Sequence, residues 1–165
     1  MTYEVTVKGV CDLLMHKFST EELTNPVEAA EKSAYRLEDG RLYLPSEHFF
    51  QSMIRAASEF RIDDKSNKTY MDYVQSAVLI EPESIPFGID VKYSIDSRPV
   101  KSKVVRHRPR ISKEWTLTFD INTLVEQFIS KDILNAILTR AGQKYGVGDY
   151  RPRFGRFTIV GFKEK

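Results

Sequence analysis

The chain has 165 residues, of which 41% are hydrophobic and 29% charged, and its formal net charge at pH 7 is +2. This length and balance predict a single globular domain spanning residues 1–165 and exclude a disordered chain. No apolar run is long enough to cross a membrane, and the N-terminus enters a strand-like pattern without a signal peptide. We therefore expect a cytoplasmic protein, of a prokaryotic cell or a virus-infected host.

Cysteine and acidic residues give little support for a metal site. Cys11 is the only cysteine, which excludes an internal disulfide and a cysteine-rich zinc site and suits a reducing compartment. Asp63 and Asp64 are adjacent, but no third ligand follows at a useful spacing. We expect neither a metal nor another cofactor.

The charges are unevenly distributed along the chain. Residues 1–97 contain 10 Lys and Arg against 17 Asp and Glu, whereas residues 98–165 contain 15 against 6. Such asymmetry indicates a face that binds a polyanion, unless the two halves interleave in space and cancel.

The first half of the chain predicts a strand and then helices. Residues 3–10 alternate between apolar and polar, as in a half-buried strand. Asn25, Pro26 and Glu28 provide the cap, first-turn proline and N3 acid of a short helix that ends near Lys32. An amphipathic helix is expected at about 46–61. A short helix at 70–75 and an apolar strand at 76–80 follow.

His48 lies in the first turn of the expected 46–61 helix. The helix dipole would lower its pKa there, and a neutral histidine can act as a general base. A helix-start histidine without chemistry is the simpler alternative.

A basic segment follows. From Arg98 to Lys113 there are seven Lys and Arg and no acid. Residues 100–105 and 115–121 both resemble strands, and we expect them to form a β-hairpin with a positive tip at about 108–113. Such a tip can hold phosphates, although exposed charge can also protect an edge strand from aggregation. The expected phosphate-binding side chains are Lys101, Lys103, Arg106, His107, Arg108 and Arg110.

The end of the chain contains a glycine- and arginine-rich segment, Gly146–Phe157. It lies between an expected helix at 131–141, with Gly142 after its C-terminus, and a final strand at 157–162. Glycine permits close backbone approach to a ligand, arginine binds phosphate, and aromatic rings stack on unpaired bases. The segment therefore indicates a nucleic-acid-binding loop, with a tight turn bearing solvated arginines as the alternative. Its expected binding residues are Gly146, Gly148, Tyr150, Arg151, Arg153, Phe154 and Arg156.

The order of expected elements is strand, helix, strand, basic strand pair, helix, strand. Without part of the hairpin this is β-α-β-β-α-β. The order predicts an α+β fold of the ferredoxin-like (RRM-like) split βαβ type with a basic β-hairpin insertion. RNA-recognition modules share this topology, although topology alone does not give function.

Three features resemble the RAMP superfamily of CRISPR-associated RNA-binding proteins. Residues 43–46 lead into a helix containing Arg55, the Gly146–Phe157 segment precedes the last strand, and the basic hairpin is similar to insertions that hold guide RNA. The chain departs from the family in lacking a glycine-serine pair in its first turn, and it is shorter than most backbone subunits. It also resembles small proteins of phages and mobile elements. The resemblance therefore includes a solitary, virus-borne relative of the RAMP proteins as well as a subunit of a CRISPR effector.

The resemblance implies a protein that grips single-stranded RNA or DNA through phosphates, either as a homo-oligomer along the strand or in a CRISPR-type complex. One alternative is a virus-encoded interaction protein that mimics or blocks a host defence complex. A second is a metal-independent endoribonuclease that uses His48; otherwise we expect no catalytic residue. No motif indicates a membrane partner.

Overall fold

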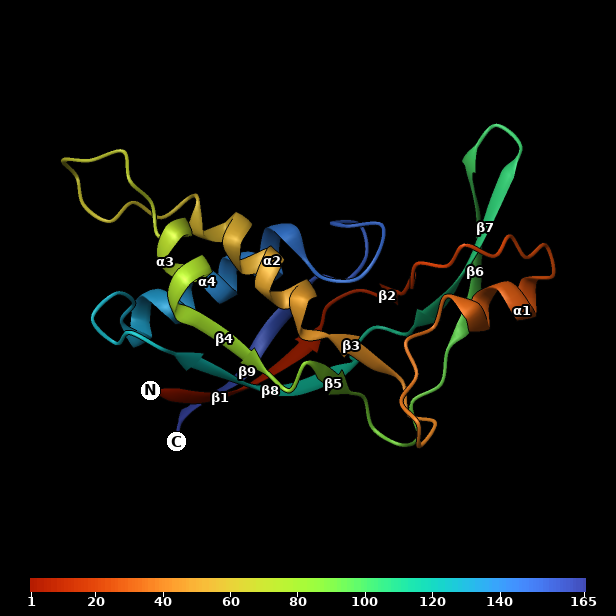
Figure 1. Ribbon diagram of the computed structural model, residues 1–165, viewed down its shortest axis with the longest axis horizontal. Helices are drawn as coiled ribbons and strands as arrows, with labels where there is room; N and C mark the ends of the chain where they lie inside the picture. The colour runs from red at the N-terminus through yellow and green to blue at the C-terminus, as the bar shows by residue number, and fades with distance from the viewer.

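The computed structural model describes residues 1–165 and is built around a four-stranded antiparallel sheet (Figure 1). Its strand order is β4-β8-β1-β9. Alternate residues of β1 are buried, as the sequence predicts, and Val5 faces Phe119 on one side and Phe162 on the other. The bounds of the strands are Thr2–Gly9 (β1), Val78–Glu81 (β4), Thr116–Thr123 (β8) and Phe157–Glu164 (β9).

Three helices cover one face of this sheet (Figure 1). They are α2 (Ser46–Ala57), α3 (Met71–Ala77) and α4 (Lys131–Arg140). Phe49 of α2 joins the layers, since its ring centroid lies 4.5 Å from that of Phe119 and 5.3 Å from that of Phe157. Burying such a ring stabilises the fold by roughly 1.5–3 kcal/mol relative to leaving it exposed.

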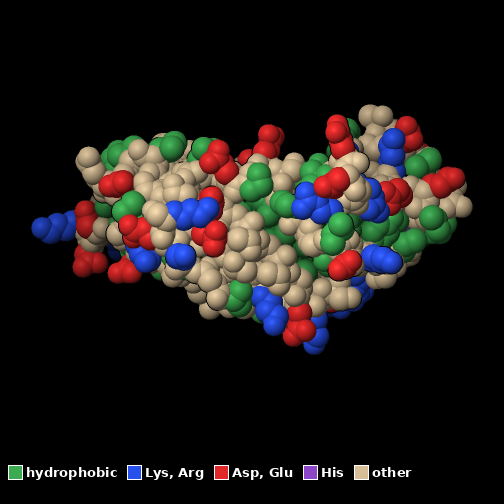
Figure 2. All heavy atoms as spheres, turned by 90° about the horizontal axis from the view of Figure 1, so that it is seen from below, with side chains coloured by type: hydrophobic (Ala, Val, Ile, Leu, Met, Phe, Trp, Pro, Cys, Tyr) green, Lys and Arg blue, Asp and Glu red, His purple; other side chains and the backbone are tan.

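The opposite face of the sheet carries mainly polar side chains and no helix. Figure 2, seen from below the sheet, shows basic and acidic side chains interspersed there rather than gathered in one basic field. The hydroxyl groups of Thr6 and Thr118 are hydrogen-bonded to each other, and Lys165 Nζ donates to Asp120 Oδ2 at 2.8 Å. The open face therefore lacks the aromatic platform on which RNA-recognition sheets stack bases.

The α+β class predicted from the sequence is confirmed, and the elements of the main sheet follow one another as β-α-β-β-α-β. Helix bounds differ in detail. α2 ends at Ala57 rather than Arg61, and residues 76 and 77 belong to α3 rather than to the following strand. No helix has the length and apolarity needed to span a membrane.

A second, smaller sheet lies beside the main one, with strand order β2-β7-β6. Its strands are β2 (Leu13–Leu14), β6 (Ser94–Lys101) and β7 (Val104–Ile111). α1 (Pro26–Lys32) packs on it and begins as predicted, because the Asn25 side chain accepts hydrogen bonds from the first-turn amides. A short pair, β3 (Tyr43–Pro45) with β5 (Ser84–Pro86), lies between the sheets (Figure 1).

The hairpin prediction is wrong in its pairing. Residues 104–111 pair with β6 rather than with residues 115–121, which belong to the main sheet as β8. The hairpin tip is at Ser102 and Lys103, not at 108–113. Alternation identified residues 115–121 correctly as a strand, but the expected strand at 100–105 spans the turn between β6 and β7. Alternation also carries no information about which strand is the partner.

The C-terminus of α4 also differs from expectation. Gly142 does not cap the helix but lies buried in a π-helical turn, Ala141–Tyr145, where a Cβ atom would collide with the Phe157 backbone. Gly146, with φ of 72°, is the left-handed residue that ends the helical segment.

Candidate nucleic-acid interface

The glycine- and arginine-rich loop, residues 146–156, is tied to the small sheet rather than free in solvent. Asp149 N–H donates to Leu14 O at 2.8 Å, and Gly155 N–H donates to Asp12 O at 2.8 Å. Gly148 has φ of 82°, and a Cβ atom there would lie 2.5 Å from Leu14 O. Gly148 therefore serves close packing of the loop on β2, whereas the sequence suggested close approach to a ligand.

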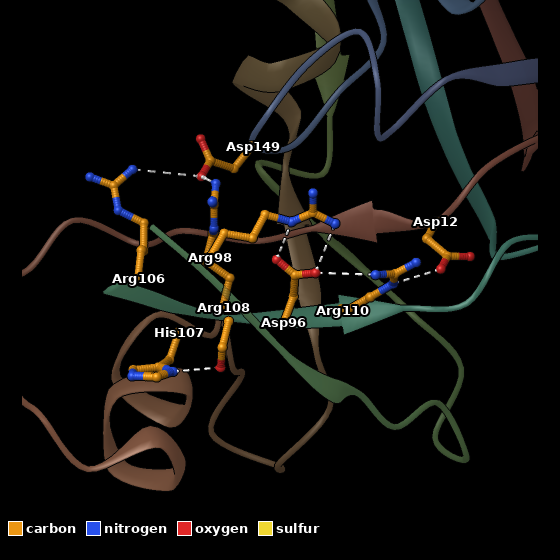
Figure 3. Close-up of polar contacts among 9 residues, drawn as sticks. Asp12, Asp96, Arg98, Arg106, His107, Arg108, Arg110 and Asp149 are labelled. Carbon is orange, nitrogen blue, oxygen red and sulfur yellow. Dashed lines mark hydrogen bonds and ion pairs between the residues drawn. The ribbon is translucent and has the colours of Figure 1, made fainter. Parts of the chain in front are cut away.

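The loop faces a ladder of alternating arginines and aspartates on the hairpin (Figure 3). Arg110 bonds Asp12 at 2.7 Å and Asp96 at 3.1 Å, and Arg98 bonds the same Asp96 at 2.7 Å. The neighbouring Arg110 and Arg98 hold the pKa of Asp96 below its usual range although burial opposes them. Much of the positive charge expected on this strand pair is thus neutralised within the protein.

Arg108 lies in the interior, with 1% of its side chain exposed. Its Nη1 donates to Asp149 of the loop, while Nε and Nη2 have no hydrogen-bond partner. Arg106 lies 3.9 Å from the same carboxylate. Because its guanidinium is enclosed, Arg108 holds the loop to the hairpin and is not displayed as a phosphate-binding side chain.

The two aromatic residues of the loop stack on hairpin arginines. The Arg98 guanidinium lies 5.3 Å from the Tyr150 ring centroid and 4.7 Å from that of Phe154. Phe154 is 5% exposed and so has no free face for a base, whereas Tyr150 is 48% exposed. Arg153, itself exposed, lies 5.7 Å from the Phe154 ring. Tyr150 and Arg153 are the loop residues best placed to meet a ligand.

The remaining expected residues are spread over several surfaces. Lys101 and Lys103 are exposed at the hairpin tip. His107 points away from the arginine ladder and lies 2.6 Å from Ser97 Oγ (Figure 3). Arg156 is exposed, and its Nε donates to Gln143 O at 3.0 Å. The structure brings together the loop and Arg98–Arg110, but it does not place every predicted residue on one face.

A basic cleft of about 370 Å³ opens between α2, the π-helical turn and the loop. Its lining includes Arg55, Lys144 and Arg151 together with the loop backbone from Gly148 to Pro152. Burial, with the nearby Arg55, lowers the pKa of Arg151. Arg55 was named from the sequence only as part of the helix that resembles the RAMP superfamily, and its exposed position on that helix is the one signal that could have marked it as a binding residue.

His48 meets the loop, a contact the sequence left open. Gly148 N–H donates to His48 Nδ1 at 3.2 Å, so the proton of the neutral ring lies on Nε2. Burial and the neighbouring Arg151 lower the pKa of His48. The first turn of α2 and the loop thus form one unit.

No group of histidine, cysteine or acidic side chains has the arrangement of a metal site.

No protein-family model matches the sequence, and no curated protein matches it either. Among solved structures, Cmr6 from Pyrococcus furiosus superposes with a TM-score of 0.51 over 98% of each chain. The two proteins share a fold. Their sequences are only 8% identical, so the likeness shows the fold alone.

Proposed function

We propose that this protein binds single-stranded nucleic acid, RNA in the first place, through the phosphates of its backbone. Its main sheet then corresponds to the ferredoxin-like split βαβ arrangement, with the β6–β7 hairpin as the basic insertion. The fold shared with Cmr6, a CRISPR protein of the RAMP type, supports the resemblance drawn from the sequence.

The observation that carries the proposal is the pair Arg55 and Arg151 in the cleft. Neither side chain forms an ion pair, and burial together with the nearby Arg55 lowers the pKa of Arg151, although Asp149 opposes the shift. The Asp149 carboxylate also lines the cleft but already pairs with Arg108, so a phosphate would relieve the remaining repulsion between the two guanidinium groups. Lys144 contributes less, because it bonds Glu59 at 2.6 Å.

A strand seated in the cleft would continue along the exposed side of the loop. Tyr150 lies at the rim of the cleft and offers an exposed ring for stacking, and Arg153 follows it. Phosphate contacts of this kind fix the strand without reading its sequence. We therefore propose low sequence specificity and a steep dependence on salt. Assembly of several copies along one strand, as in backbone subunits, is a further part of this proposal.

The test is fluorescence anisotropy with labelled single-stranded RNA, single-stranded DNA and duplex DNA, at several salt concentrations. Arg55→Ala/Arg151→Ala should weaken single-strand binding about 10-fold or more and reduce the slope of log K against log salt by about 1–2. The control, Lys65→Ala/Lys68→Ala, removes the same charge from an exposed loop distant from the cleft and should change affinity less than twofold. Equal losses in both variants would show that net charge, not the cleft, governs binding.

The contact of His48 with the loop favours one second candidate, a metal-independent endoribonuclease. The Nε2–H of neutral His48 can donate a hydrogen bond to a phosphate oxygen of a strand held by Arg151, and general-base action would require Nδ1 to be released from Gly148 N–H. A denaturing gel of the incubated RNA separates the two functions: cleavage that His48→Ala abolishes supports the nuclease, and intact RNA supports simple binding. Absence of binding to all three nucleic acids would reject both and favour the interaction protein that blocks a host defence complex.

A further inference from the structure

The outer half of β7 has an edge that no strand of this chain covers. β2 pairs only with Ile111 and Arg110, and the last bond on this side runs from Met15 N–H to Pro109 O at 3.0 Å. The chain then turns away, and Lys17 N–H bonds Ser33 O instead. Between Val104 and Arg108, therefore, β7 is hydrogen-bonded along one edge only, by β6.

The direction of the free backbone groups follows from the pairing. Pro109 directs its carbonyl toward β2, and alternate residues of an antiparallel strand direct N–H and C=O to the same edge. His107 and Val105 therefore direct their N–H and C=O groups away from β6. No bond outside the ladder involves either backbone. The edge thus offers two donors and two acceptors at the two-residue spacing of a β-ladder.

This edge lines a cleft of about 510 Å³, the larger of the two described. The opposite wall is the segment from His16 to Thr24 together with α1. Four basic side chains line the cleft against two glutamates, Glu21 and Glu22. One of the four, Lys32, pairs with Glu21 at 3.3 Å, and Arg106 lies 3.9 Å from Asp149 outside the cleft lining, which leaves two lysines without an acidic partner. The basic side chains are Lys17, Lys32, Lys103 and Arg106.

A histidine nitrogen at the same place lacks a partner. His16 Nδ1 is buried and makes no hydrogen bond, although the residue lines the cleft. Buried polar atoms in folded proteins are nearly always bonded, so an unpaired one beside a cleft indicates a missing partner.

We propose that this cleft binds an extended, acidic polypeptide segment of another protein, which adds as a strand to the free edge of β7. Strand addition satisfies the backbone groups of Val105 and His107, and the surrounding basic side chains pair with carboxylates at alternate positions of the segment. His16 Nδ1 is buried, so it is not counted among the contacts of the segment.

A polypeptide fits these observations better than a nucleic acid. Phosphates would satisfy the basic side chains and the two N–H groups, but they offer nothing to the outward carbonyls of Val105 and His107. RNA has donors in its 2′-hydroxyl and base amino groups, but only a polypeptide backbone alternates donors and acceptors at the two-residue spacing of this edge. The site is also separate from the Arg55–Arg151 cleft, so it stands whether or not the proposed nucleic-acid binding is correct.

The probe is a library of acetylated, amidated heptapeptides with Asp or Glu at alternate positions and apolar residues between them. Binding to the full chain is measured by fluorescence anisotropy, and the amide signals of Val105 and His107 are followed by ¹⁵N NMR. We expect the best peptides to shift both amides. N-methylation of the peptide bonds that face β7 should weaken binding about tenfold or more at unchanged charge.

Two protein variants complete the test. Val105→Pro removes an outward donor without removing a ladder bond, and Pro109 occupies an equivalent position in the same strand. It should weaken peptide binding about tenfold, whereas Val105→Thr, which keeps the N–H and the branched shape, should change affinity less than twofold. The proposal is overturned if no library member binds below about 1 mM, the limit of useful affinity. It is also overturned if N-methylated peptides bind as well as the parent, or if RNA oligomers and not peptides shift the two amides.

Discussion

The ion pair between Arg108 and Asp149 gives the most direct test of how the loop is held. Asp149→Asn keeps the shape of the side chain but leaves the Arg108 charge in a site that is 1% exposed, where two of its three nitrogen atoms already lack partners. Removing one member of a fully buried pair costs about 3–5 kcal/mol. Asp149 is 31% exposed, so water screens part of the interaction. We therefore expect a loss of about 3 kcal/mol and a fall in Tm of roughly 6–12 °C for a chain of this size.

Urea unfolding followed by circular dichroism measures the loss. Asp64→Asn is the control, because this exposed side chain takes part in no ion pair. The double variant Arg108→Met/Asp149→Asn should be more stable than Asp149→Asn alone, since methionine removes the stranded charge and keeps the volume. A change below about 0.5 kcal/mol in Asp149→Asn, the usual range for surface substitutions, would show that the pair does not hold the loop.

Three further predictions concern the loop and its support. The pKa of His48 is lowered in the folded state, so His48 contributes stability that is complete above its ordinary pKa of 6.5 and is lost as pH falls. His48→Gln should therefore reduce the dependence of the unfolding free energy on pH between pH 7 and 5, as measured by urea titration. An unchanged pH profile contradicts this prediction. Gly148→Ala should lower the free energy of unfolding by about 2–3 kcal/mol. The control Gly40→Ala should lower it by about 1 kcal/mol, because Gly40 also has a positive φ but has open space around it. Equal losses in the two variants would exclude the packing clash. Trp115→Phe leaves Cys11 O without its 2.9 Å donor and should cost about 1–3 kcal/mol, and a neutral effect would show that this bond is replaced by water.

Local signals predicted the main helices and the strands of the main sheet well, but not β6 and β7. Asn25 and Ser130 cap the helices that begin after them, as their side-chain bonds to the first-turn amides show. The alternation of residues 115–121 identified β8 because one side of that strand faces the helices. These features depend on neighbours within four residues, which a sequence displays directly.

The candidate site could be predicted only in part, because its decisive contacts are not local. Arg108 and Asp149 are 41 positions apart, and nothing near Arg108 distinguishes it from the exposed arginines around it. The same holds for Arg55, which meets the loop only through the fold. A basic run in a sequence therefore counts charges without revealing which of them are already paired inside the protein.

The central position of β1 has a consequence for synthesis on the ribosome. Thr2 bonds Asn122, 120 positions away, and β9 at the far end of the chain covers the other edge of the same strand. β1 therefore stays unpaired, with its apolar side exposed, until residues 116–164 have emerged. Closing such distant contacts slows folding, because the entropy of a long loop is lost before the pairing is gained. In the cell, the nascent chain would depend on chaperones during that interval more than a protein of this size with local contacts.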